Sequence, residues 1–198
     1  MDNSNHTRAI RAWVMYDWAN SAFATTIMAA VLPVYYSSVA SAGLPANEAT
    51  ANWAFTTTIS LFLIAIMAPI LGAMADFSGA KKRFLSLFVF MGVTGTSLLY
   101  LVNTGDWMKA SIFYIMGSIG FSGANVFYDS LLPHVARADE IDQVSSRGYA
   151  MGYLGGGLLL AVNLAMILLA PEELTGLMSR LSFLMVAVWW FVFTIPLW

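Results

Sequence analysis

The sequence contains no cysteine and very little charge. Without cysteine, the chain forms neither a disulfide framework nor a thiolate metal site. Charged residues make up 10% of the 198 residues and hydrophobic residues 59%, whereas soluble domains carry about 25% charged residues. A chain this apolar cannot cover a water-facing surface with polar side chains, so we expect its outer surface to face lipid.

Long basic runs and catalytic clusters are also missing. The net charge is -2 and the longest basic run is Lys81 to Arg83, which argues against nucleic acid as a partner. The only histidines, His6 and His134, lie outside the apolar runs, and no His-Glu-x-x-His spacing occurs. The sequence therefore predicts no enzyme activity, no metal and no cofactor.

What the sequence does contain is a series of long apolar runs. A helix needs about 20 apolar residues to cross the roughly 30 Å hydrocarbon core. Turn-forming clusters such as residues 43–45 (GLP) and 104–106 (TGD) separate the runs. We predict an all-α integral membrane protein with a polar cytoplasmic segment at 1–11 and a six-helix transmembrane domain at 12–198, with spans at about 12–39, 51–75, 84–103, 110–132, 148–170 and 177–198.

Lysine and arginine fall mostly on one side of these predicted spans. That side holds Arg8, Arg11, Lys81, Lys82, Arg83, Arg137 and Arg147, and the other holds Lys109 and Arg180. The positive-inside rule then predicts a plasma-membrane protein with both termini in the cytoplasm. Tryptophans near span ends are expected to anchor at the membrane interfaces, namely Trp13, Trp53, Trp107, Trp189 and Trp198.

Two carboxylates, Asp17 and Asp129, lie inside predicted spans. A charged group at the bilayer centre costs about 2.5 to 3.5 kcal/mol on insertion scales, so each carboxylate is a functional candidate. We expect both to lie at a similar depth, roughly 8 to 10 Å from the cytoplasmic end at 1.5 Å per residue. An ionised carboxylate there needs water, a cation or a proton, so we expect coupling to H⁺ or Na⁺, between which the sequence does not decide.

Polar residues accompany these carboxylates at helical spacing. In the run 110–132, steps of four, three and four from Ser118 draw a polar stripe down one face. Smaller stripes follow Asp17 and Tyr149. We predict a solute or ion pathway lined by Asp17, Asn20, Ser21, Ser122, Asn125, Asp129, Tyr149, Tyr153 and Asn163. The alternative is that the serines, asparagines and tyrosines only join helices, at about 0.6 kcal/mol per hydrogen bond.

Glycines crowd the start of the run 148–170. We expect them to let two helices approach closely and rock against each other, and they are Gly148, Gly152, Gly155 and Gly156. Leucines follow Gly157 in place of the Lys-Ser or Lys-Thr of a phosphate-binding loop, so ATP-driven transport is not predicted.

The connection after the second run resembles the signature loop of the major facilitator superfamily. The matching residues are Gly72, Asp76, Gly79, Lys81 and Lys82. In that superfamily the loop latches a cytoplasmic gate against the other half of the transporter. Phe77 and Ala80 depart from the usual basic residues, and the run 110–132 lacks the arginine of many proton-coupled drug exporters. These departures argue against a drug-antiport mechanism.

Residues 16–23 (YDWANSAF) and 125–133 (NVFYDSLLP) resemble the vacuole-effluxer branch of the superfamily, which includes autophagy-associated amino-acid exporters. The resemblance covers essentially the whole chain but one half of a normal member, which has two six-helix halves. It implies a secondary transporter, or its amino-terminal half, that moves a small polar solute such as an amino acid by alternating access.

The resemblance also implies a partner, either a second six-helix half or an identical chain in a homodimer. Because the chain stops at Trp198 directly after its last apolar run, we expect a fragment rather than a homodimer subunit. The alternative function is a membrane module that scaffolds a partner without transporting a solute.

Overall fold

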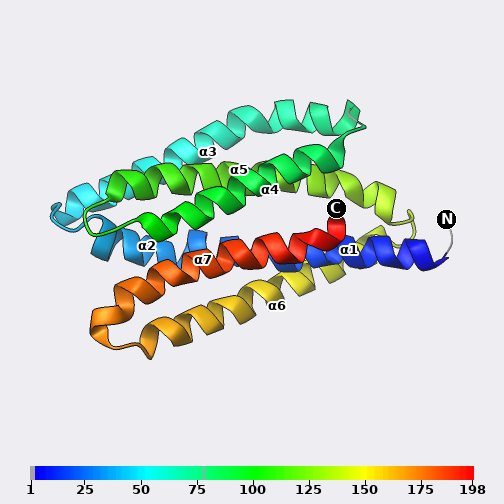
Figure 1. Cartoon of the computed structure of the whole chain (residues 1–198). Helices are drawn as coiled ribbons and strands as arrows, with labels where there is room; N and C mark the ends of the chain where they lie inside the picture. The colour runs from blue at the N-terminus through cyan, green and yellow to red at the C-terminus, as the bar shows by residue number, and fades with distance from the viewer. Residues whose placement is uncertain (1–2, 78) are drawn as a thin grey trace.

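The structure is a computed structural model and describes residues 3–77 and 79–198. In these residues every regular element is helical, and the elements form a bundle whose helices run side by side between two ends (Figure 1). Among the described residues, six helices are long and apolar enough to cross a membrane. The predicted all-α, six-span membrane architecture is therefore confirmed.

The first span changes its winding along its length. It consists of α1 (Asn3–Ala22), the π-helical stretch η1 (Phe23–Ala30), α2 (Val31–Tyr35) and a second π-helical stretch η2 (Tyr36–Ala40). At the end of η1 the backbone N–H of Val31 donates to the carbonyl of Thr26, five residues back, as a π-helix requires. Pro33, two residues later, has no N–H and cannot continue a regular α-helical ladder.

The other spans are more regular. They comprise α3 (Ala46–Phe77), α4 (Lys81–Leu98) with the 3-10 turn η3 (Leu99–Leu101), α5 (Trp107–Val135), α6 (Ile141–Leu168), and α7 (Thr175–Thr194) between the 3-10 turns η4 (Glu172–Leu174) and η5 (Ile195–Leu197). The turns before α3 and α5 contain glycines with positive φ, Gly43 at 92° and Gly105 at 83°. Only glycine adopts this conformation without steric cost.

The helices extend beyond the predicted apolar runs. Residues 3–11, predicted as a separate polar segment, form the first turns of α1. Similarly, α3 begins at Ala46 rather than 51, and α6 begins at Ile141 rather than 148. Uncharged runs mark the part of a helix that lipid requires to be apolar, but the backbone hydrogen bonds of the helix continue past the hydrocarbon core.

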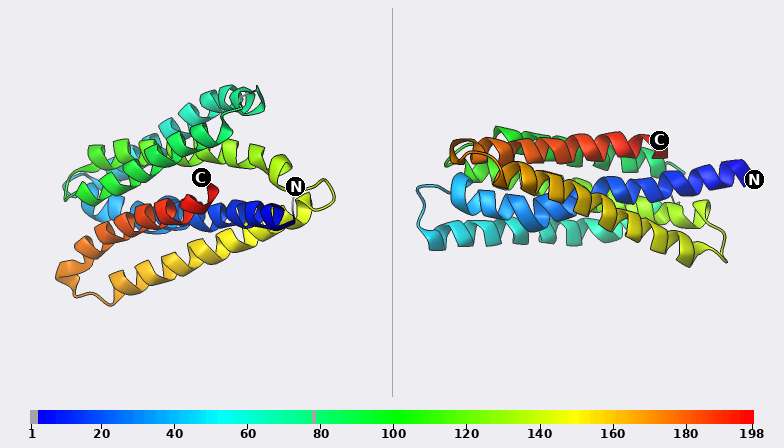
Figure 2. Two further views of the ribbon diagram at one scale, coloured as in Figure 1. Left: turned by 45° about the vertical axis from the view of Figure 1, so that its right-hand side comes forward. Right: turned by 90° about the horizontal axis from the view of Figure 1, so that it is seen from below.

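The helices of the bundle form two groups, which are separated in the left view of Figure 2. One group contains α1, α6 and α7, and the other contains α3, α4 and α5. The groups meet where α4 contacts α7 and where α1 contacts α5. An aromatic cluster joins them at the centre, with the ring of Phe23 lying 5.2 Å from that of Phe121 and 5.6 Å from that of Trp190.

Two tryptophans predicted as interfacial anchors pack against other helices. Trp13 is 2% exposed, stacks on Tyr128 at a centroid distance of 4.3 Å, and donates from Nε1 to the Tyr128 carbonyl at 3.1 Å. Trp189 stacks on Trp18 at 5.4 Å and donates to the Trp18 carbonyl at 3.2 Å. A buried indole N–H needs an acceptor, and neighbouring helices supply it here. The anchor role predicted for the buried Trp13 is wrong, whereas Trp189 is half-buried and its anchor role stays a prediction.

Candidate functional site

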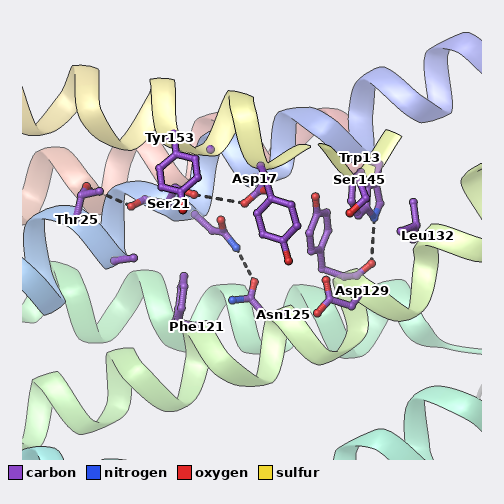
Figure 3. Close-up of a pocket in the computed structure, with 15 residues that line it drawn as sticks. Trp13, Asp17, Ser21, Thr25, Phe121, Asn125, Asp129, Leu132, Ser145 and Tyr153 are labelled. Atoms are coloured by element: carbon purple, nitrogen blue, oxygen red, sulfur yellow. Dashed lines mark hydrogen bonds between the residues drawn. The ribbon is translucent and has the colours of Figure 1, made fainter. Parts of the chain in front are cut away.

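A cavity of about 330 Å³ lies between α1, α5 and α6. Binding sites for small molecules commonly have volumes of roughly 300 to 1,000 Å³, so a small solute fits this space. The cavity is lined by seven of the nine predicted pathway residues, which are Asp17, Asn20, Ser21, Asn125, Asp129, Tyr149 and Tyr153. Figure 3 shows the labelled ones among them, such as Asp17, Asp129 and Tyr153, projecting from three different helices into one space.

The two carboxylates occupy this cavity from different helices. Asp17 lies on α1 and accepts a hydrogen bond from Ser21 Oγ at 3.3 Å, one helical turn further along. Asp129 lies on α5 and is close enough to Asp17 for the two carboxylates to interact electrostatically. The cavity lining contains no lysine, arginine or histidine, and the ion pairs found among the described residues involve neither carboxylate.

Two asparagines connect the helices that bear the carboxylates. Asn20 Nδ2 donates to Asn125 Oδ1 at 2.5 Å, from α1 to α5 (Figure 3). Asn20 is 3% exposed, so its amide is satisfied within the protein rather than by solvent. This hydrogen bond fixes the position of α1 relative to α5 beside the carboxylates.

Aromatic side chains form much of the remaining cavity wall. Tyr149 and Tyr153 lie one turn apart on α6 and are 65% and 80% exposed. Tyr128 on α5 is 4% exposed, and its hydroxyl has no hydrogen-bond partner among the described residues. Trp13 and Phe121 complete the aromatic part of the lining.

Helical spacing could have revealed several of the lining residues that the sequence analysis missed. Trp13 precedes Asp17 by one turn of α1, Phe121 precedes Asn125 by one turn of α5, and Tyr128 is adjacent to Asp129. Of these three, only Trp13 was given a role from the sequence, that of an interfacial anchor.

The glycines of α6 lie directly against α1. A Cβ atom added at Gly152 would lie 2.6 Å from Ser21 Oγ and 3.0 Å from Asp17 Oδ1, and one added at Gly155 would lie 2.6 Å from the Trp18 carbonyl oxygen. Similar contacts occur at Gly148 and Gly156. Small residues at these positions allow the close approach of α6 that brings its tyrosines to the cavity.

Ser122 and Asn163, both predicted to line the pathway, do not lie on this cavity. Ser122 faces α3, where it neighbours Met67 and Leu71. Asn163 is fully buried, with its Nδ2 3.5 Å from Thr26 Oγ1 in the π-helical stretch. Residues spaced three and four apart spread over a wide part of the helix circumference. Those at the edge of this part face a different neighbouring helix from those at its centre.

The segment that resembles the gate loop is mostly helical. Gly72 and Asp76 belong to the last turns of α3, and Gly79 lies in the turn before α4. Lys81 Nζ donates to the Ser130 carbonyl at 3.1 Å, and Lys82 Nζ donates to the Trp198 carbonyl at 3.3 Å. Lys81 therefore connects this segment to the residue that follows Asp129 on α5.

Comparisons with known proteins show where this architecture belongs. The uncharacterized MFS-type transporter YxiO of Bacillus subtilis (strain 168) is 41% identical over 196 residues, which cover 96% of this chain and 46% of the relative. Autophagy-related protein 22 of Coccidioides immitis (strain RS) is 22% identical over 200 residues, covering 74% of this chain and 33% of that protein. Its namesake in Pichia angusta is 27% identical over 169 residues, covering 72% of this chain and 30% of that protein.

The chain thus spans about half the length of its bacterial relative and about a third of the fungal ones. No solved structure shows a significant match. The family model described as "Vacuole effluxer Atg22 like" matches residues 5–198. Because this match covers nearly the whole chain, the protein belongs to the Atg22-like vacuole effluxer family of MFS-type transporters, a family of multi-pass membrane proteins and not of enzymes.

Proposed function

We propose that this chain forms one six-helix half of a secondary transporter that moves a small polar solute by alternating access. The observation that carries the proposal is the cavity between α1, α5 and α6, to which two helices contribute the carboxylates of Asp17 and Asp129. Carboxylates within a membrane span are costly to insert and mark solute or ion pathways. Packing alone does not require this pair.

The proposed transporter couples solute movement to H⁺ or Na⁺ through the same two carboxylates. The solute is small because the cavity holds about 330 Å³, and the family resemblance favours an amino acid. A second six-helix half, or a second copy of this chain, is the proposed partner that closes the pathway from the opposite side. The bacterial relative supports the plasma membrane as the location.

The helical segment around Gly72, Asp76 and Gly79 is the proposed cytoplasmic gate. Its contact to α5 runs through Lys81 Nζ and the Ser130 carbonyl, next to Asp129. Binding or release of a ligand at Asp129 would therefore act on the adjacent Ser130 carbonyl and on its hydrogen bond to Lys81. Lys82 lies at the same end of the bundle, where basic residues of a membrane protein face the cytoplasm.

Flux into proteoliposomes tests this function. The chain is reconstituted and supplied with radiolabelled amino acids, with and without a proton or sodium gradient. Asp17→Asn and Asp129→Asn should each lower uptake by about tenfold or more, as expected for loss of a charge-assisted interaction. Ser122→Ala is the matched control, because Ser122 faces α3 rather than the cavity and should leave uptake unchanged.

Two outcomes contradict the proposal. Unchanged uptake in both aspartate variants would remove the carboxylates from the pathway. Absence of uptake for every solute, by protein that is well folded, would contradict transport by this chain alone. It would favour either a half that needs its other six-helix half or a membrane module that does not transport.

A further inference from the structure

We infer that the cavity binds the protonated amine of its solute, so that the substrate class is organic ammonium cations. Asp17 and Asp129 provide the opposite charge, and the rings of Tyr149 and Tyr153 provide π faces. The inference rests on the proposed function only in treating the bound molecule as a transported solute.

The charge balance of the cavity favours a cation. Its lining carries two carboxylates and no basic side chain, and the ion pairs among the described residues lie elsewhere, at His6–Glu140 and Lys109–Asp106. Asp17 is half-buried and Asp129 is exposed, but both lie within membrane spans, where ionised side chains pair with an opposite charge or line a solute pathway. A protonated amine supplies that partner, whereas a solute whose only charged group is a carboxylate would meet two like charges.

The lining favours an organic cation over a bare metal ion. Among the described residues there is no group of three histidine, cysteine, aspartate or glutamate side chains that could hold a metal ion, and Asn125 Oδ1 already accepts the amide hydrogen of Asn20. The rings of Tyr149 and Tyr153 are largely exposed and stack on no other aromatic ring of the described chain. A free aromatic face attracts an ammonium group through its quadrupole.

The hydroxyl of Tyr128 provides an independent indication. It is buried without a hydrogen-bond partner among the described residues, although Tyr128 borders the cavity and its side chain lies within electrostatic range of both carboxylates. A buried hydroxyl without a partner is costly and requires an explanation. A primary ammonium has three N–H donors and no acceptor. In the inferred complex the carboxylates of Asp17 and Asp129 accept two of these hydrogen atoms, and the Tyr128 hydroxyl at the border of the cavity accepts the third.

Three matched ligands separate the amine from the carboxylate of an amino acid. Alanine carries both groups, ethylamine carries the amine alone, and propionate carries the carboxylate alone. The chain is placed in lipid nanodiscs without any gradient, and binding is followed by the fluorescence of tryptophan, because Trp13 lines the cavity. Ethylamine and alanine should bind saturably, and propionate should not.

Variants connect this selectivity to the named residues. Asp17→Asn and Asp129→Asn should weaken ethylamine binding by roughly tenfold or more, because each loses a charge-assisted hydrogen bond. Tyr153→Leu should weaken it roughly two- to fivefold, whereas Tyr153→Phe, which keeps the ring, should not. Tyr153 is 80% exposed, so both variants are expected to fold. Asp139→Asn, an exposed carboxylate outside the cavity, is the control.

The inference is overturned if propionate binds as well as ethylamine, if ethylamine shows no saturable binding, or if its binding is unchanged in both aspartate variants. Saturable sodium binding that ethylamine does not displace would assign the carboxylates to an inorganic cation. Failure of transport is distinguishable from these results. A chain that binds ethylamine selectively but gives no flux contradicts transport by this chain alone and still supports the ammonium site.

Discussion

Single side chains control how the helices that bear the carboxylates are positioned. The hydrogen bond between Asn20 Nδ2 and Asn125 Oδ1, 2.5 Å long, joins α1 to α5 next to Asp17 and Asp129. Within a membrane such a bond competes with fewer water molecules, but the unfolded chain in lipid also finds partners for its amides. The hydrogen bond therefore adds only modest net stability, but it joins α1 to α5 at the position of the two carboxylates.

We predict measurable coupling between these two asparagines. In a double-mutant cycle of Asn20→Ala and Asn125→Ala, the coupling free energy should be about 0.6 kcal/mol, and at most about 1.7 kcal/mol. The measurement is the unfolding free energy of each variant in mixed micelles. Ser86→Ala is the control, because Ser86 Oγ donates to the Lys82 carbonyl of its own helix. A coupling of zero would show that the bond contributes nothing in the membrane-like state.

Whole helices approach one another only where their side chains are small. On α6, Gly155 faces the Trp18 carbonyl oxygen, to which an added Cβ would lie 2.6 Å away, whereas a Cβ added at Gly157 meets nothing within 4 Å. Because the obstacle at Gly155 is backbone, it cannot rotate aside. The two glycines thus lie on opposite sides of one helix with different roles.

Alanine substitutions at these two positions should differ clearly. Gly155→Ala should lower the unfolding free energy by about 1 to 3 kcal/mol, since α6 must move away from α1. Gly157→Ala should cause no loss, because its Cβ enters open space. Chemical denaturation of both variants in the same detergent measures the difference, and equal effects would contradict the tight α1–α6 contact.

The connection between α5 and α6 is held to α1 by Glu140. Its carboxylate accepts the Arg137 backbone N–H at 2.9 Å and pairs with His6 Nε2 at 2.5 Å. The hydrogen bond from the Arg137 N–H, and to a smaller extent the contact with His6, hold the pKa of Glu140 below its ordinary value. These contacts therefore stabilise the connection while Glu140 is ionised.

This connection should loosen in acid. A depressed folded-state pKa means that the stabilisation is present above the unfolded value of 4.5 and is lost as the pH falls through the lower folded value. Hydrogen exchange of residues 136–141, corrected for intrinsic rates, should accelerate below that pH. In Glu140→Gln the acceleration should be absent, because exchange in this variant is already fast above that pH. Asp139→Asn should keep the pH profile of the unmodified chain. An unchanged profile in Glu140→Gln would contradict this mechanism.

For the whole molecule, the distribution of charge between its two ends predicts its orientation. The connections α3–α4 and α5–α6 lie at the end that carries most lysines and arginines, and the connection α6–α7 lies at the other (Figure 1). The positive-inside rule then places the first end in the cytoplasm. Because the chain contains no cysteine, a single introduced thiol reports its own side without background.

Thiol labelling in intact cells should establish this orientation. Glu173→Cys, in the exposed turn before α7, should react with a membrane-impermeant maleimide without permeabilisation. Asp139→Cys, in the exposed connection between α5 and α6, should react only after permeabilisation. The unmodified chain should not react at all, and the reverse pattern would place the termini outside the cytoplasm.

The sequence by itself determined the number of spans, their approximate limits and the two carboxylates. These features follow from local properties, because lipid requires about 20 apolar residues per span and makes every internal charge costly wherever the neighbouring helices lie. Asp17 and Asp129 were therefore recognisable before any packing was known. Asn20 and Asn125 were recognisable as polar neighbours at helical spacing, but the hydrogen bond between them was not.

Only the tertiary structure decided which face of each helix meets which neighbour. It turned Ser122 toward α3 and Asn163 toward Thr26, and it buried Trp13 against Tyr128. In a soluble protein the apolar face of a helix points to the core, so sequence periodicity reveals the buried side. In a membrane the lipid is as apolar as the core, so sequence periodicity cannot distinguish the buried face of a helix from its lipid-facing side. Small residues and paired polar groups determine the packing there.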